Sequence, residues 1–240
     1  MAKANTRPRK RGDHMEIIEN ALKQGRTALS EYESKMLLAS YKIPVTREVL
    51  AGTSDELISA AHEIGFPVVI KGCSPEISHK TEKGLIRIDI RNDNEALQAY
   101  KDITAGMSGS NGAVLVQEMV KGERELVIGL IRDPQFGPCV MFGLGGIFTE
   151  ILKDVSFRLA PLEERDALEM MGEIKAHKIL DAVRGMEPAD RGVLTEMLIT
   201  VGKIGLENDA IKEIDMNPVI ISGSRPIAAD ALVVLQSTAQ

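Results

Sequence analysis

Short apolar strands and capped helices alternate along almost the whole chain, and this alternation restricts the folds that are open to it. In the first half, Ser30 with Glu33 three residues later forms a capping box, and Thr53 precedes a second helical pattern that Gly65 ends. The expected elements there are helices at residues 30–41, 53–64 and 92–100 and strands at residues 66–71, 85–90 and 113–117. These elements predict a small lobe in which helices pack on a sheet.

The second half orders its elements differently and predicts a second lobe. The expected strands are residues 125–131, 140–144, 210–214, 219–221 and 227–229, and the expected helices are residues 163–171, 176–183 and 189–202. A short connection near residues 118–122 joins the two lobes. The sequence therefore predicts an α+β (α/β) fold of two lobes, each with a β-sheet and packed helices, with a ligand in the cleft between them.

The same pattern sets the expected domain boundaries. Residues 1–14 carry five basic residues against one acidic residue and lack apolar periodicity, so we expect a disordered basic leader or an expression tag. Residues 15–29 predict an N-terminal helical segment. Residues 30–240 predict the main domain, with the N-lobe at about 30–118 and the C-lobe at about 119–240.

Composition excludes several classes of protein. Hydrophobic residues make up 44% of the 240 residues and charged residues 27%, which is typical of a globular protein with a full core. No apolar run has the length of a membrane span, so we expect no membrane partner. A net charge of −6 and an aromatic content of 3% argue against binding nucleic acid. Two cysteines without a metal or redox motif favour the reducing cytoplasm.

Lys71 and a polar loop after it form the first candidate site. Lys71 ends the apolar strand at residues 66–71, where an ammonium can bind a phosphate as a point charge, although an edge-strand surface lysine is the alternative. The following loop holds His79 next to Lys80. Neighbouring cations attract a phosphoryl group and favour the neutral, nucleophilic imidazole. His79 is therefore a candidate phosphoryl acceptor, with Lys80 beside it.

The connection between the lobes is a candidate hinge for a nucleotide base. Glu118, Met119, Val120 and Lys121 join one strand to the next, and backbone groups at such a hinge can pair with an adenine edge. Glu125, just beyond, has a carboxylate that can bind ribose hydroxyls. A charged hairpin without ligand is the alternative.

A glycine-rich segment follows the strand at residues 140–144. Its third glycine is misplaced for the dinucleotide fingerprint. Gly145 and Gly146 can nevertheless let the backbone approach a phosphate or a partner loop. A tight structural turn explains the same residues equally well.

Oxygen ligands gather near the C-terminus. Asp215 and Asn217 share one face of a strand by period two, in a segment expected to end that strand, and Asp230 closes the next strand. Few and hard oxygen ligands suit Mg²⁺ that arrives with nucleotide phosphates. The alternative is an acidic turn ahead of a proline.

Taken in order, these motifs resemble the ATP-grasp superfamily, and more narrowly the β subunits of ADP-forming acetyl-CoA (acyl-CoA) synthetases, relatives of succinyl-CoA synthetase. The resemblance covers about residues 30–235. It implies that Lys71 holds nucleotide phosphates, that Glu118 to Lys121 form the adenine hinge and that Glu125 binds ribose. It also implies Mg²⁺ ligation by Asn217 and Asp230 with Asp215 close by, and transient phosphorylation of His79.

The resemblance further implies an acid–CoA ligase of the acetate type, which interconverts acyl-CoA, ADP and phosphate with a carboxylic acid, CoA and ATP. Its cofactors would be ATP or ADP and Mg²⁺. Its partner would be a CoA-binding α subunit that carries a phosphohistidine segment, in an α2β2 heterotetramer. Two alternatives stay open: a stand-alone ATP-grasp carboxylate–amine ligase and a nucleotide-binding regulatory subunit.

Overall fold

The computed structural model describes residues 13–75, 84–107, 112–146, 153–182 and 185–236. Its contacts divide the chain into two compact units. Within the described ranges, unit 1 comprises Ser30–Glu33 and Thr46–Met119, and unit 2 comprises residues 13–29, Ser34–Val45 and residues 120–236. Each unit has its own sheet, as the sequence predicts.

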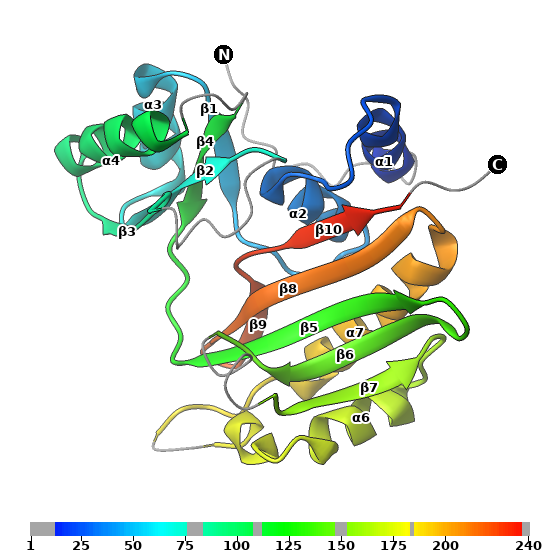
Figure 1. Cartoon of the computed structure of the whole chain (residues 1–240). Helices are drawn as coiled ribbons and strands as arrows, with labels where there is room; N and C mark the ends of the chain where they lie inside the picture. The colour runs from blue at the N-terminus through cyan, green and yellow to red at the C-terminus, as the bar shows by residue number, and fades with distance from the viewer. Residues whose placement is uncertain (1–12, 76–83, 108–111, 147–152, 183–184, 237–240) are drawn as a thin grey trace. The chain divides into compact units, whose positions relative to one another are not determined.

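Unit 1 is a four-stranded sheet with two helices packed on it (Figure 1). Its strands are β1 (Glu48–Ala51), β2 (Val68–Cys73), β3 (Ile86–Ile90) and β4 (Ala113–Glu118), and its helices are α3 (Ser54–Ile64) and α4 (Asp93–Gly106). The order β1-β4-β2-β3 is antiparallel throughout and places β2 between β4 and β3. All six residues of β2 are buried, which fits a central strand.

Local signals in the sequence explain both helices of unit 1. The side chain of Thr53 accepts a hydrogen bond from the Glu56 amide, and Asn92 caps α4 in the same way through the Glu95 amide. Gly65 ends α3 with a positive φ of 93°, a conformation that glycine adopts without a steric penalty. These three predictions are confirmed. Helix α4 continues to Gly106, six residues beyond its expected end.

Helix α2 (Glu31–Ser40) begins with the predicted capping box. The Glu33 amide donates to Ser30 Oγ over 3.3 Å, and the Ser30 amide donates back to Glu33 Oε2 over 2.9 Å. Its first residues belong to unit 1, whereas its later residues, with Leu37 and Leu38 fully buried, belong to the core of unit 2. The division at residue 118 that the sequence suggested therefore differs from the structural units at this helix.

Unit 2 is built on a six-stranded antiparallel sheet. Its strands are β5 (Arg124–Asp133), β6 (Gly137–Leu144), β7 (Val155–Leu159), β8 (Ile211–Ser222), β9 (Arg225–Ala228) and β10 (Leu232–Leu235), and its helices are α1 (Asp13–Lys23), α6 (Glu164–Glu173), the 3-10 helix η1 (His177–Leu180) and α7 (Arg191–Glu207). The order is β10-β8-β5-β6-β7, and β9 pairs with β8.

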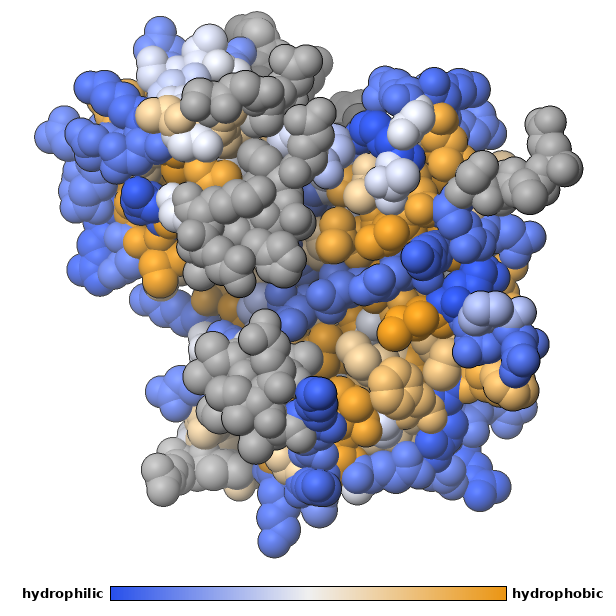
Figure 2. All heavy atoms as spheres, in the orientation of Figure 1, coloured by the Kyte–Doolittle hydropathy of each residue, from blue (hydrophilic) through white to orange (hydrophobic). Residues whose placement is uncertain are grey.

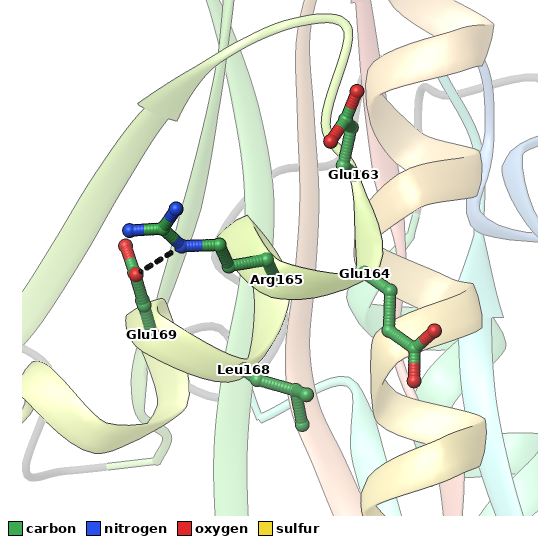
Figure 3. A pocket seen from close by; sticks show the side chains of 5 residues that line it. All are labelled: Glu163, Glu164, Arg165, Leu168 and Glu169. Atoms are coloured by element: carbon green, nitrogen blue, oxygen red, sulfur yellow. Dashed lines mark hydrogen bonds and ion pairs between the residues drawn. The ribbon is translucent and has the colours of Figure 1, made fainter.

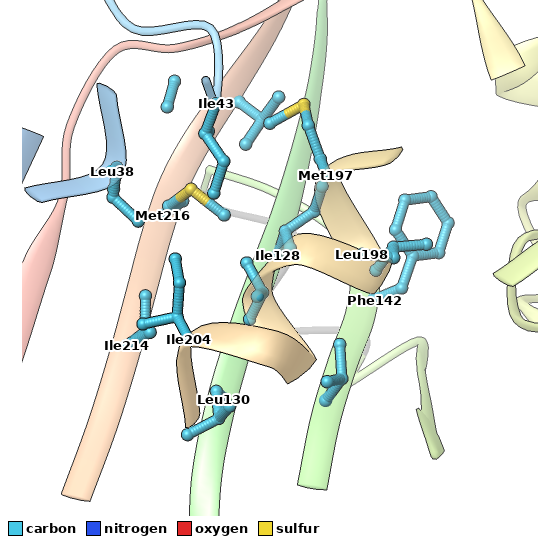
Figure 4. Close-up of a cluster of buried hydrophobic side chains, with 14 of the residues drawn as sticks. Leu38, Ile43, Ile128, Leu130, Phe142, Met197, Leu198, Ile204, Ile214 and Met216 are labelled. Atoms are coloured by element: carbon cyan, nitrogen blue, oxygen red, sulfur yellow. The ribbon is translucent and has the colours of Figure 1, made fainter. Parts of the chain in front are cut away.

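Helix α7 lies against one face of this sheet, behind β5 and β6 in Figure 1. Figure 4 shows the resulting core, in which Ile128, Phe142 and Met216 from three strands meet Leu198 and Ile204 of α7. Side chains alternate between the two faces of a strand. The residues between these core positions therefore point to the opposite face, which we call the open face.

The largest departure from the predicted elements concerns β8. The sequence suggested two strands separated by residues 215–218, but β8 is continuous from Ile211 to Ser222. Pro218 is accommodated because the pairing between β5 and β8 shifts register between Leu126 and Ile128, so that Asn217 and Pro218 form a bulge opposite Val127. Asp215 and Asn217 thus lie within a strand and not at its end.

Other differences are smaller. The sequence did not predict β1, β7 or β10, each of only four or five residues. The helix expected at residues 176–183 is a single 3-10 turn, η1. Helix α1 begins at Asp13, two residues before the expected segment. Within the parts of the chain that the structure describes, no helix is long and apolar enough to cross a membrane.

Candidate functional site

Lys71 is a buried cation inside β2. The strand continues through Cys73, so Lys71 does not end it as the sequence suggested. Its backbone lies between Leu115 of β4 and Ile86 of β3. Its Nζ lies 2.7 Å from Oε1 of Glu31, the first residue of α2, and the two side chains are 6% and 1% exposed. Both residues belong to unit 1, and their pairing was not predicted.

His79 and Lys80 lie outside the described residues, so their predicted roles stay predictions. The described residues near the two ends of this loop include Ser74, which is buried, and Gly84, whose φ is +67°.

The hinge segment starts at the end of β4. Oε1 of Glu118 accepts from the Arg47 amide and Oε2 from the Arg47 guanidinium, each over 2.8 Å. The Glu118 amide in turn donates to the Arg47 carbonyl. Residues 119–121 form neither helix nor strand, and no backbone hydrogen bond joins them to another described residue. Glu118 thus anchors the segment, and the backbone groups of the next three residues could bind a ligand edge.

The glycine turn at the end of β6 draws two predicted ligands together. The Gly145 amide donates to the Glu125 carbonyl over 2.9 Å, and the Gly146 amide donates to Asn217 Oδ1 over 2.9 Å. Gly146 has a φ of +60°, and a Cβ there would overlap the Glu125 carboxylate. The turn therefore requires glycine, and it sets Glu125 beside Asn217.

Asp230 lies opposite Asn217. Leu232 of β10 pairs with Asp215 of β8, and the Ala229 amide donates to the Pro218 carbonyl. Both contacts follow one antiparallel register, and this register puts residue 230 across from residue 217. The structure thus brings together the three residues that the sequence suggested as metal ligands, within unit 2.

The pKa of Asp215 is raised from its ordinary value near 3.8 to about 6. Burial of the carboxylate is the main cause, followed by repulsion from Glu213 and from Asp230. The negative charges on this part of β8 are therefore close enough to oppose one another. A bound cation would relieve that repulsion.

Carboxylate and amide oxygens of this kind fit Mg²⁺ in its preference for hard ligands. These residues suit an ion that other groups also hold, because no cluster of three His, Cys, Asp or Glu residues within the described ranges could bind a metal alone. Asn217 Oδ1 already accepts from Gly146, and Asp230 Oδ1 accepts from the Ala231 amide. A carboxylate or amide oxygen carries two lone pairs, so an oxygen that accepts one hydrogen bond can also bind a cation.

The open face continues from these polar residues into an apolar surface. Figure 2 shows a hydrophilic band along β8 with hydrophobic residues beside it over β5, β6 and β7. The pairing register explains the arrangement, because it aligns Ile131, Cys139 and Leu159 in one row across these strands. Ile131 and Leu159 are 47% and 50% exposed.

A shallow depression on α6 lies elsewhere in unit 2 (Figure 3). Glu163, Glu164, Arg165, Leu168 and Glu169 line it, and Arg165 pairs with Glu169 over 2.8 Å. None of its lining residues belongs to the predicted site. Side chains of a single helix, one pair of them already bonded to each other, do not form a binding site.

Glu31 and Arg47 were not predicted from the sequence as partners of site residues. Both contacts join segments more than thirty residues apart, and a pairing pattern of that kind cannot be seen in local periodicity. The only local signal was the capping box, which fixed Glu31 as the first residue of a helix.

The chain matches the family described as ATP-grasp domain over residues 20–235. It is 43% identical over 234 residues to the β subunit of acetate–CoA ligase [ADP-forming] II from Pyrococcus furiosus, covering 94% of this chain and 99% of that subunit. It is also 40% identical to acetate–CoA ligase [ADP-forming] I from Archaeoglobus fulgidus, where it covers 92% of this chain and 33% of the relative.

The structure resembles acetyl-coenzyme A synthetase 1 of Ca. Korarchaeum cryptofilum in complex with coenzyme A and Mg-AMPPCP, whose phosphohistidine segment points towards its nucleotide binding site. The TM-score is 0.83 and the identity 43%, covering 93% of this chain and 100% of the other. The predicted two-sheet ATP-grasp fold is thereby confirmed. The chain belongs to the ATP-grasp family and, within it, to the group that contains the β subunits of ADP-forming acetate–CoA ligases.

Proposed function

We propose that this chain is the nucleotide-binding subunit of an ADP-forming acid–CoA ligase. The enzyme would interconvert an acyl-CoA, ADP and phosphate with a carboxylic acid, CoA and ATP. One observation carries the proposal: the glycine turn holds Asn217 opposite Asp230 and beside Glu125, with Asp215 on the same face of β8. These oxygens suit a nucleotide that brings a magnesium ion with it.

Each predicted site residue would have one role in binding the nucleotide. Lys71 would place a positive charge on its phosphates, and the backbone of residues 119–121 would pair with the adenine edge. Glu125 would accept hydrogen bonds from the ribose hydroxyls, and Asn217, Asp230 and Asp215 would hold Mg²⁺. Bound Mg²⁺ would neutralise phosphate charge, which is the main requirement of phosphoryl transfer.

His79 would carry the phosphoryl group between two sites. In the ATP-forming direction, an imidazole nitrogen of His79 would attack the phosphorus of a phosphohistidine on the partner, which leaves as neutral imidazole. A terminal oxygen of ADP would then attack the phosphorus on His79, forming ATP and restoring the free imidazole. Lys80 would stabilise the negative charge of the group in transit.

The partner would be a CoA-binding α subunit with a mobile phosphohistidine segment. The fused relative from A. fulgidus supports a partner, because this chain corresponds to one third of that protein. In K. cryptofilum synthetase, coenzyme A and a phosphohistidine segment occur in the same structure as the nucleotide analogue. We further propose an α2β2 assembly, which native mass spectrometry of the co-expressed subunits would test.

Reconstitution tests the proposed function. The chain is co-expressed with a CoA-binding subunit, and ADP release is measured with acid, CoA, ATP and Mg²⁺ present together or omitted one at a time. We expect activity only with all four. Release that needs an amine instead of CoA would indicate a carboxylate–amine ligase, and tight nucleotide binding without turnover would indicate a regulatory subunit.

Replacing His79 with Ala separates the relay from simple binding. We expect H79A to bind Mg-ADP normally but to lose turnover by at least about a hundredfold, because the variant lacks a covalent nucleophile. We also expect it to lose the acid-labile label that [γ-³²P]ATP would leave on the protein. His62→Ala is the matched control, because His62 is a surface histidine that pairs with Asp93 and contacts the Phe66 ring. Full turnover by H79A would refute the relay.

A further inference from the structure

Lys71 and Glu31 form an ion pair that is almost fully removed from water. Their side chains are 6% and 1% exposed, whereas in the Arg47–Glu118 and Arg158–Glu173 pairs every side chain is more than a quarter exposed. Taking two charges out of water is costly, and a well-packed apolar pair is often as stable. A protein can tolerate this desolvation cost where one of the two charged groups has a second role.

The geometry fixes where the Lys71 ammonium lies. Its backbone is held between two strands, and Nζ donates to Glu31 Oε1 over 2.7 Å. An ammonium has three N–H donors, so the same group can bond a carboxylate and a phosphate oxygen at once. Without a carboxylate at this place, a flexible four-carbon side chain would have several rotamers available.

Glu31 is itself firmly placed. It is the first residue of α2, and the capping box of Ser30 and Glu33 fixes the start of that helix. The N-terminus of a helix carries partial positive charge, which favours a carboxylate in the first turn. The helix therefore presents an anionic oxygen at a defined point beside β2.

We propose that Glu31 is a positioning residue for nucleotide binding. Its carboxylate orients the Lys71 ammonium and keeps it in one rotamer, so that the ammonium is preorganised for phosphate oxygens. This inference rests on the proposed function, because it requires that Lys71 bind nucleotide phosphates.

The test measures the dissociation constant of Mg-ADP by calorimetry on the full chain for E31Q, E31D, K71M and the double variant E31Q/K71M. We expect K71M to weaken binding about thirtyfold, E31Q about tenfold and E31D about fourfold, in line with the loss of one charged hydrogen bond and its partial recovery. A positioning role exerted through Lys71 predicts that the double variant binds no more weakly than K71M alone.

Asp93→Asn is the matched control. Asp93 is the first residue of α4 and lies 2.9 Å from Nε2 of His62, but it is 50% exposed. Removing its charge perturbs a helix N-terminus in the same unit without touching Lys71. We expect D93N to bind Mg-ADP within twofold of the wild type, so a larger change would show that a general loss of helix capping explains E31Q.

Each outcome separates the inference from the proposed function. If K71M loses affinity but E31Q binds like the wild type, the positioning role is wrong and the nucleotide site stands. If K71M binds like the wild type, the assignment of Lys71 itself fails. Thermal unfolding without nucleotide shows whether each variant is folded. E31D keeps the carboxylate on a side chain that is one methylene shorter. If E31Q does not fold, wild-type affinity of E31D would overturn the inference.

Discussion

The amide of Gly146 donates a hydrogen bond to Oδ1 of Asn217 over 2.9 Å, although the two residues are 71 positions apart in the sequence. The bond orients the Asn217 side chain with its oxygen towards the glycine turn. The same turn lies against the Glu125 carboxylate. Changes to the turn should therefore affect nucleotide binding through two predicted ligands at once.

Replacing Gly146 with Ala should weaken Mg-ADP binding about tenfold or more and lower the free energy of unfolding by roughly 1–3 kcal/mol, because the new Cβ is strained at a φ of +60° and overlaps Glu125. Calorimetry and urea unfolding measure the two effects.

Gly137→Ala is the control for that change. Gly137 has a φ of +82° at the other end of β6, but a Cβ added there would have no other atom within 4 Å beyond its chain neighbours. This variant should lose stability through the backbone alone and bind nucleotide like the wild type. Equal loss of binding in both variants would contradict the role given to the glycine turn.

The raised pKa of Asp215 gives a pH dependence of stability. Folding raises the pKa to about 6, so the folded state favours the protonated form. The contribution is fully present below about pH 4, where both states are protonated, and it is lost as the pH rises through about 6. Without metal, D215N should escape this loss and be more stable than the wild type at pH 8 by roughly 1–3 kcal/mol.

Urea unfolding in EDTA between pH 4 and pH 8 checks this, and the difference between D215N and the wild type should shrink towards pH 4. Asp209→Asn serves as the control, because that side chain is 85% exposed. A D215N curve parallel to the wild type at every pH would contradict the prediction. With Mg-ADP present the order should reverse, since D215N lacks a proposed ligand.

The contact between Arg47 and Glu118 should matter more for binding than for stability. The Arg47 side chain is 60% exposed, and exposed pairs contribute only about 0–1 kcal/mol. E118Q should therefore unfold within about 1 kcal/mol of the wild type. It should bind Mg-ADP several-fold more weakly, because Glu118 anchors the segment proposed to bind adenine. Unchanged affinity in calorimetry would show that the hinge is positioned without this carboxylate.

Arg124 should be a stability residue and not a binding residue. Its guanidinium is buried and donates to the carbonyls of Ile179, Asp181, Glu187 and Gly223. Arg124→Met would leave these acceptors unpaired and should cost about 3–5 kcal/mol in urea unfolding. Arg124→Lys should recover little, because an ammonium cannot reach four carbonyls that match a planar guanidinium. A small loss in either variant would contradict this.

Much of the fold could be predicted because its signals are local. The Thr53 cap, the Gly65 end and the capping box at Ser30 each depend on residues within a few positions. The period-two pattern of β3 and the apolar residues of β2 were equally readable. Short strands such as β7 were not, since five residues with two exposed apolar side chains carry little periodicity.

The sequence suggested candidate site residues but not the contacts between them. Asp215 and Asn217 share a face by strand geometry alone, which needs no tertiary information. Their position opposite Asp230 depends on strand register, and the Gly146–Asn217 bond depends on how β6 and β8 are placed around β5. The Glu31 partner of Lys71 lies forty residues away.

Pro218 interrupts the regular pairing of the long strand β8 next to Asn217, a proposed metal ligand. An imino acid offers no N–H, so the ladder with β5 cannot run regularly past this point, and it shifts between Leu126 and Ile128. A one-residue slip exchanges the two faces of a strand. Without the bulge, strict alternation after Asn217 would turn Val219 and Ile221 away from the core in which both are buried. The irregularity at the proline thus lets one long strand present Asp215 and Asn217 on the open face and still return its later apolar residues to the interior.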